Sequence, residues 1–158
     1  MFRKCKSYCR SGIGLILIEI LLSGWVISGS ESNWRSYTES CLGICFDDTD
    51  GNVKLKKWEL KVTEKGFFRL RKYFPKGKEE YFSFNVRKFV SLDYLGTEES
   101  GTLLITTRDA DVIVQTYNDP AGNIDSMSNI LKIPVKNIKL NQLDSLARDL
   151  MQIKIELK

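Results

Sequence analysis

Apolar residues at alternate positions dominate the middle of this chain, and this pattern limits the fold more than any other feature. Between residues 82 and 94 apolar side chains recur on even positions, and polar side chains separate most of them. A period of two is typical of strands with one buried face. Lys88 interrupts the run. The sequence therefore predicts either one long bent strand or two shorter ones in this region.

Shorter predicted strands lie on both sides of this region. Runs with the same period occupy residues 53–55, 58–62, 68–74 and 131–135, and continuous apolar runs occupy 103–105 and 112–114. Turn-forming segments separate several of them, at 64–66, 75–78 and 108–111, and we expect the last to be a hairpin connection. The phase changes at Lys56-Lys57, which indicates a bulge. Pro134 cannot donate to a ladder, so its strand is expected at an edge.

The last part of the chain changes period. From Leu140 to Met151 the apolar residues recur every three or four positions, which predicts an amphipathic helix of about three turns. Asn141 is the expected N-cap, and residues 153–157 alternate as a short extended piece. The predicted fold is mainly β (α+β), a bent antiparallel sheet or small barrel of six to seven strands with a C-terminal amphipathic helix.

The first thirty residues resemble an export signal. A head with Arg3, Lys4, Lys6 and Arg10 precedes an apolar run over 11–30 that ends in small residues. These are the parts of a cleaved signal peptide, and they also describe a single transmembrane anchor or, less directly, a buried helix. The predicted organisation is a hydrophobic leader helix over 1–30, a spacer over 31–52 and a β-rich domain over 53–158. The expected location is extracytoplasmic, either secreted or anchored to a membrane.

Two cysteine pairs share the same spacing, Cys5 with Cys9 and Cys41 with Cys45. Together they would suit a zinc site, but a leader that enters a membrane or is removed keeps them apart. In an oxidising compartment Cys41 and Cys45 are expected to form a local disulfide. A redox pair is the weaker alternative, because such motifs usually separate the cysteines by two residues. Cys5 and Cys9 are candidates for acylation or have no role.

The sequence shows no catalytic, cofactor-binding or metal-binding motif. The acidic turn after Cys45 matches the calcium-loop pattern at Asp48, Asp50 and Gly51, but has Phe46 and Lys57 at the first and last ligand positions. The chain contains no histidine, which excludes Ser-His and Cys-His nucleophilic sites. We therefore expect a protein that is not an enzyme and has no cofactor.

The order of elements resembles that of bacterial pleckstrin-homology-like domains, in which a helix plugs one end of a bent seven-stranded barrel. The segments "LLITTRDADVIVQTYND" and "LKIPVKNIKLNQLDSLARDLMQI" carry this resemblance. It implies that basic residues of the first hairpin contact an anionic partner, and those present here are Lys54, Lys56, Lys57, Arg69, Arg71 and Lys72. Lysines on strand edges also protect against aggregation. The alternative folds are a β-sandwich with an appended helix and a small ligand-holding barrel.

Charge limits the function further. From Glu31 onward 20 Lys/Arg face 19 Asp/Glu, so the folded part is close to neutral and nucleic acid is not the expected partner. The expected function is a non-catalytic binding module, exported or anchored, for a protein or envelope partner. The alternative is a carrier or sensor of a small apolar ligand, suggested by the aromatic residues of the strands. Membrane contact is expected through 11–30 if that segment is retained.

Overall fold

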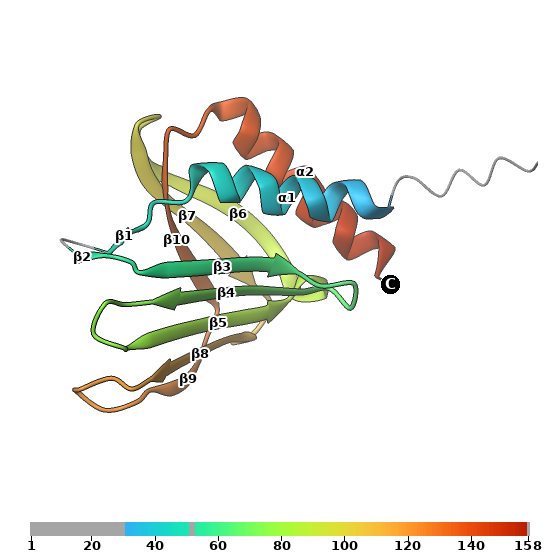
Figure 1. Cartoon of the computed structure of the whole chain (residues 1–158). Helices are drawn as coiled ribbons and strands as arrows, with labels where there is room; N and C mark the ends of the chain where they lie inside the picture. The colour runs from blue at the N-terminus through green and yellow to red at the C-terminus, as the bar shows by residue number, and fades with distance from the viewer. Residues whose placement is uncertain (1–30, 51–52, 158) are drawn as a thin grey trace, which may run out of the picture.

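The computed structural model describes residues 31–50 and 53–157 of the chain (Figure 1). Two α-helices and ten strands follow one another along these residues, with one short 3-10 helix between β5 and β6. In chain order the elements are α1 (Glu31–Cys45), β1 (Thr49–Asp50), β2 (Val53–Lys54), β3 (Lys57–Val62), β4 (Phe67–Tyr73), β5 (Glu79–Asn85), η1 (Val86–Lys88), β6 (Phe89–Gly96), β7 (Ser100–Thr107), β8 (Val112–Tyr117), β9 (Asp125–Ser128), β10 (Ile130–Lys136) and α2 (Leu140–Glu156).

Two antiparallel sheets form the body of the protein. The larger has the strand order β3-β4-β5-β8-β9 and the smaller has β10-β7-β6, while β1 and β2 form a separate short ribbon. The prediction of a mainly β fold with a C-terminal helix is confirmed. The prediction of one bent sheet or a closed barrel is wrong, because the two sheets do not pair with each other.

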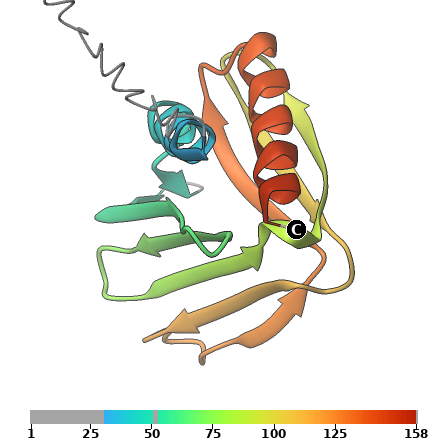
Figure 2. The ribbon, with the colours of Figure 1, turned by 90° about the vertical axis from the view of Figure 1, so that its right-hand side faces the viewer.

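The opening between the sheets is occupied by α1, which contacts β3, β10 and α2. Figure 2 shows α1 end-on between the first strands of the larger sheet and β10. Glu39 on α1 accepts a hydrogen bond of 2.6 Å from the backbone N–H of Val62 on β3. On the other side, the N–H of Asp47 donates to the carbonyl of Pro134 at 3.0 Å. The helix thus fills the space in which the edges of β3 and β10 would have to meet to close a barrel.

This helix lies where the sequence indicated a polar spacer. Thr38, Cys41, Leu42 and Cys45 are buried, and their spacing of three, one and three residues is that of one helix face. The ring of Phe46, which follows the helix, lies 4.3 Å from the ring of Trp58. The segment therefore belongs to the folded core, and its short buried face was a sequence signal that the polar composition obscured.

The even-numbered apolar run from 82 to 94 folds as the second of the two predicted alternatives. It divides into β5 and β6, which belong to different sheets and are joined by η1. The side chain of Asn85 caps η1 by accepting the backbone N–H of Arg87 at 3.0 Å. The chain therefore changes sheets at the position where Lys88 interrupts the alternation.

The connection at 108–111 also differs from the prediction. A hairpin would pair β7 with β8, but β7 lies between β10 and β6, while β8 lies between β5 and β9. Residues 108–111 therefore link the two sheets, with Asp109 in the left-handed region at φ 61°. The backbone N–H of Arg108 donates to the backbone carbonyl of Lys88 at 2.7 Å. This bond brings the second link between the sheets against the first, at η1.

The C-terminal helix is longer than predicted, because Ile153 and Ile155 continue it instead of forming an extended piece. Its N-cap is Lys139, not Asn141, and the side chain of Gln142 accepts the backbone N–H of Lys139 at 2.9 Å. Pro134 lies on β10, an edge strand of the smaller sheet, as predicted. The core joins both sheets and both helices through Leu42, Phe68, Leu70, Phe84, Phe89, Leu103, Ile105, Leu131, Ile133, Leu146 and Leu150, each almost completely buried.

Within the described part of the chain, neither helix is long and apolar enough to cross a membrane. The predicted leader over 1–30, with Cys5 and Cys9, lies outside the described residues.

Candidate functional site

The side of the larger sheet that is turned away from both helices carries charged and aromatic side chains. Odd-numbered residues of β3, β4 and β5 point to this side, and even-numbered ones such as Phe68 and Leu70 point into the core. We call this side the outer sheet face; it contains Lys57, Glu59, Lys61, Phe67, Arg69, Arg71, Tyr73, Glu79, Tyr81, Gln115 and Tyr117. In Figure 2 the strands of the larger sheet are stacked below α1, from β3 nearest the helix down to β9.

Most charges on the outer sheet face have an opposite charge beside them. Lys57 pairs with Glu59 at 2.5 Å, and Arg71 pairs with Glu79 at 2.6 Å. The hydrogen bond from Lys57 holds the pKa of Glu59 below its usual value. The guanidinium of Arg71 also lies 5.3 Å from the ring centre of Tyr73. These contacts order the part of the face nearest the start of β3.

Lys61 and Arg69 are different. They lie directly opposite each other on β3 and β4, and both are exposed. Neither makes an ion pair with another described residue, and the guanidinium of Arg69 lies 5.6 Å from the ring centre of Phe67. Like charges directly opposite each other in a sheet are destabilising. This pair therefore leaves two adjacent positive charges without a counter-charge.

A hollow of about 340 Å³ lies at this place. Glu59, Lys61, Arg69, Arg71 and Tyr81 line it. Glu59, Arg71 and Tyr81 form one cross-strand row, and Lys61 and Arg69 belong to the next row. The hollow thus places the unpaired positive pair beside one aromatic ring, that of Tyr81, and beside Glu59, whose charge is already paired with Lys57. The pair suits a negatively charged group.

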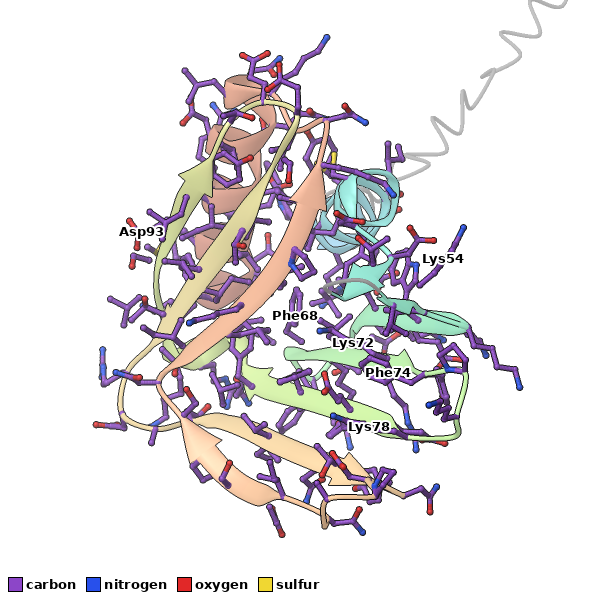
Figure 3. All side chains as sticks on the ribbon, turned by 90° about the vertical axis from the view of Figure 1, so that its left-hand side faces the viewer. Lys54, Phe68, Lys72, Phe74, Lys78 and Asp93 are labelled. Carbon is purple, nitrogen blue, oxygen red and sulfur yellow. The ribbon has the colours of Figure 1, made fainter. Side chains whose placement is uncertain are left out.

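The six basic residues that were predicted to contact an anionic partner lie in different parts of the structure. Lys57, Arg69 and Arg71 lie on the outer sheet face. Lys54 is on the short ribbon, 3.5 Å from Asp48, and Figure 3 shows it at the periphery. Lys56 precedes β3 and is exposed. The six residues therefore do not form one surface.

Lys72 is the clearest exception. It points to the inner side of the sheet, is 7% exposed and lies 3.5 Å from Glu80. In Figure 3 Lys72 and Phe68 lie on the same side, toward the interior. Because strand residues alternate between faces, Lys72 cannot share a surface with Arg71. Lys61, which the prediction omitted, takes its place, and the hairpin register through the turn at Gly66 was the signal that could have identified it.

The inner charges form a network of their own. Lys78 lies 3.0 Å from both Glu80 and Asp119, and 5.3 Å from the ring centre of Phe74 (Figure 3). The backbone N–H of Ala121 and then Lys78 hold the pKa of Asp119 below its usual value. This network ties the turn after β4 to the loop after β8, and its charges already have partners.

Cys41 and Cys45 are both free thiols, one helical turn apart on α1. Burial raises the pKa of Cys41 to about 11, and burial also raises that of Cys45. The amide of Gln142 donates to the sulfur of Cys45 at 3.9 Å. A catalytic thiol needs a lowered pKa, so this environment does not suit a nucleophile. The expected disulfide is absent from the described residues, and the pair lies in a helix and not beside a turn.

The acidic turn after α1 is held by Lys136 of β10, whose ammonium lies 3.0 Å from Asp48 and 3.6 Å from Asp47. The hydroxyl of Thr49 donates to Asp47 at 2.7 Å and lowers its pKa. Among the described residues, no group of three or more cysteine or acidic side chains could hold a metal ion. The turn thus connects α1 to the smaller sheet through ion pairs.

Comparison with known proteins gives no match to a family model, to a curated protein or to a solved structure. Any function therefore has to be argued from the geometry of these residues.

Proposed function

We propose that this chain is a non-catalytic binding module and that its outer sheet face holds an acidic segment of a partner protein. The observation that carries the proposal is the Lys61–Arg69 pair, two exposed like charges directly opposite each other with no acidic partner among the described residues. Such an arrangement is unfavourable in the free protein. A bound carboxylate would remove the repulsion and gain two charge-assisted hydrogen bonds.

The surroundings of the pair support a peptide as the partner. Phe67 and Tyr81 lie on the same face as the two cations, and Tyr73 and Tyr117 extend it. Aromatic side chains and arginine are the residues enriched in protein interfaces. The folded part has nearly equal numbers of acidic and basic residues, so a strongly polyanionic partner such as nucleic acid gains little from the rest of the surface.

The packed interior favours the binding module over a carrier of an apolar ligand. Aromatic residues that suggested a carrier, among them Phe68 and Phe84, are almost completely buried and stack with ring centres 5.1 Å apart. They fill the space between the sheets as core side chains. The exported or membrane-anchored location and the pleckstrin-homology-like resemblance remain part of the proposal, and both are compatible with a partner at the cell envelope.

The test measures binding of a fluorescein-labelled oligoglutamate peptide to the full-length chain in mild detergent, by fluorescence anisotropy. We expect oligoglutamate to bind more tightly than oligoglutamine of equal length and the difference to decrease with added salt. The double variant Lys61→Gln/Arg69→Gln should weaken binding by about tenfold or more.

Lys132→Gln is the matched control, because Lys132 is an exposed lysine on β10 of the other sheet. Equal binding by the double variant and the wild type would contradict the site. Tighter binding to anionic lipid vesicles than to the peptide, again dependent on Lys61 and Arg69, would assign the face to a membrane instead of a protein.

A further inference from the structure

A second pocket lies between the two helices, away from the outer sheet face. Its volume is about 260 Å³, and it is lined by Trp34 and Tyr37 of α1 and by Ser145, Arg148 and Asp149 of α2. Figure 2 shows the two helices side by side above the larger sheet. The pocket therefore depends on α1, the segment that the sequence assigned to a spacer.

Polar atoms at this helix contact lack partners. Asp149 is 4% exposed, and its Oδ2 atom makes no hydrogen bond to any described residue. The same holds for the indole Nε1 of Trp34 and the hydroxyl of Thr38 one turn further along α1. Buried polar atoms in folded proteins are almost always paired. Two of these atoms, on Asp149 and Trp34, belong to residues that line the pocket, which indicates that a group from outside completes the site.

The pocket also carries one charge of each sign. Arg148 is exposed, donates to the hydroxyl of Ser145 at 3.1 Å and forms no ion pair with another described residue. Asp149 is the buried charge, and burial raises its pKa although the neighbouring Arg148 opposes this effect. A buried carboxylate without a partner is strongly disfavoured. The pocket thus offers a desolvated acid inside and a guanidinium without an ion pair nearer the solvent.

We propose that the interhelix pocket binds a small zwitterion of amino-acid size. Its ammonium group pairs with Asp149, its acidic group pairs with Arg148, and its apolar part lies against Trp34 and Tyr37. The aromatic rings add a cation–π attraction for the ammonium group, and the indole N–H of Trp34 is a free donor for an oxygen of the ligand. This proposal is independent of the partner site on the outer sheet face.

The two charges decide between this ligand and simpler ones. An organic cation without an acidic group would pair with Asp149 but would be repelled by Arg148. An anion without an ammonium group would pair with Arg148 but would be repelled by Asp149. A molecule with both charges a few atoms apart satisfies both residues. The volume is below the range of pockets for drug-sized ligands, which limits the ligand to about the size of an amino acid. A free amino acid and an ethanolamine phosphate headgroup share this chemistry.

The test is a thermal-shift screen of the full-length chain in mild detergent, with each of the common free amino acids and with O-phosphoethanolamine as probes. We expect at least one probe to raise Tm, and calorimetric titration to give saturable binding of that probe. Its decarboxylated or dephosphorylated amine and its deaminated acid, tested at the same concentration, should not raise Tm. Stabilisation by an amino acid or by O-phosphoethanolamine distinguishes the two sources.

Two variants connect binding to the pocket. Asp149→Asn keeps the shape of the side chain, and Arg148→Gln changes an exposed residue, so the second remains informative if the first does not fold. Each should weaken binding by about tenfold or more, while Asp144→Asn, at an exposed position of the same helix, should leave it unchanged. The proposal is overturned if no probe raises Tm, if the amine alone stabilises as well as the zwitterion, or if binding persists in both variants.

Discussion

The outer sheet face and the interhelix pocket both contain charges without ion-pair partners, but the charges differ in their exposure to solvent. Lys61 and Arg69 are exposed, so their mutual repulsion is screened by solvent. Asp149 is buried, and its Oδ2 atom has no hydrogen-bond partner among the described residues. An unpaired surface charge costs tenths of a kcal/mol, about 0.2–1. An unpaired buried polar group costs about 1–3 kcal/mol.

This contrast shows what each region can signal. At the surface, the arrangement of charges indicates the sign of a partner but changes stability little. Between the helices, an unpaired polar atom lowers the stability of the folded state more. It is therefore a stronger indication that a ligand binds there.

The largest effect is expected from the packing of α1. Leu42 is 1% exposed, whereas Ile44 on the same helix is 78% exposed. Leu42→Ala should lower the free energy of unfolding by about 2–5 kcal/mol because it leaves a cavity. Ile44→Ala should change it by a few tenths of a kcal/mol, since its side chain is mostly in water. Chemical denaturation of the full-length chain measures both, and equal small effects would mean that α1 is not part of the core.

The thiols of α1 should react slowly in the folded protein. With a pKa of about 11 instead of 9.0, Cys41 has about a hundredfold less thiolate at mildly alkaline pH, and thiolate is the reactive form. Alkylation by iodoacetamide, followed by mass spectrometry, should therefore be at least that much slower than in denaturant. A chain that loses two hydrogens in mass through a Cys41–Cys45 bond would instead support the disulfide that the sequence predicted.

The pH dependence of stability should separate Asp149 from Asp47. Burial raises the pKa of Asp149, so the folded state holds this proton more tightly, and the associated stability is lost as pH rises through the folded pKa. As pH rises from acidic to neutral, the free energy of unfolding of Asp149→Asn should therefore increase by on the order of 1 kcal/mol relative to that of the wild type.

Asp47 should change the stability with pH in the opposite direction. Its pKa is lowered, mainly by the hydroxyl of Thr49, so its stability is present at neutral pH and is lost as pH falls through the lowered value. Denaturation curves of Asp149→Asn, Asp47→Asn and the exposed control Asp144→Asn over a pH series measure these effects. Parallel pH profiles for wild type and Asp149→Asn would show that the carboxyl of Asp149 is not desolvated.

The smallest effect is expected on the outer sheet face. Lys61→Glu places an acid opposite Arg69 and should raise the free energy of unfolding by about 0.2–1 kcal/mol. The same variant should lose oligoglutamate binding. Lys132→Glu, opposite Leu104 on β10 and β7, should change neither property. A destabilised Lys61→Glu protein would show that the two cations do not repel each other in the free chain.

Much of the fold could be predicted from local pattern. Alternation identified most strands, Pro134 identified an edge, and the spacing of Leu143, Leu146 and Leu150 identified α2. The assignment of strands to sheets could not be predicted, because β5 and β6 or β7 and β8 have the same period whether they pair or separate. The link at 108–111 has the composition of a hairpin turn but joins two sheets.

The candidate sites were less predictable than the fold. The resemblance to pleckstrin-homology-like domains indicated the hairpin residues Arg69 and Arg71, but only the register shows that Lys61 lies beside them and that Lys72 lies on the other side. The interhelix pocket had no sequence signal. Trp34 and Asp149 are 115 positions apart in the sequence, and neither residue has a motif around it.

The periodicity of apolar residues, the charges and the turn-forming residues were enough to predict a mainly β protein with a C-terminal amphipathic helix, because these properties depend on neighbours in sequence. Packing was needed to turn residues 31–45 into a core helix, to keep the sheets open and to bury Asp149 with its Oδ2 atom unpaired. Burial and pairing depend on which distant surfaces meet, and the free energy of an unpaired charge depends on whether water can reach it. For this reason two unpaired cations on the outer sheet face cost little free energy, whereas an unpaired carboxylate oxygen between the helices costs more and is the basis of the ligand site proposed there.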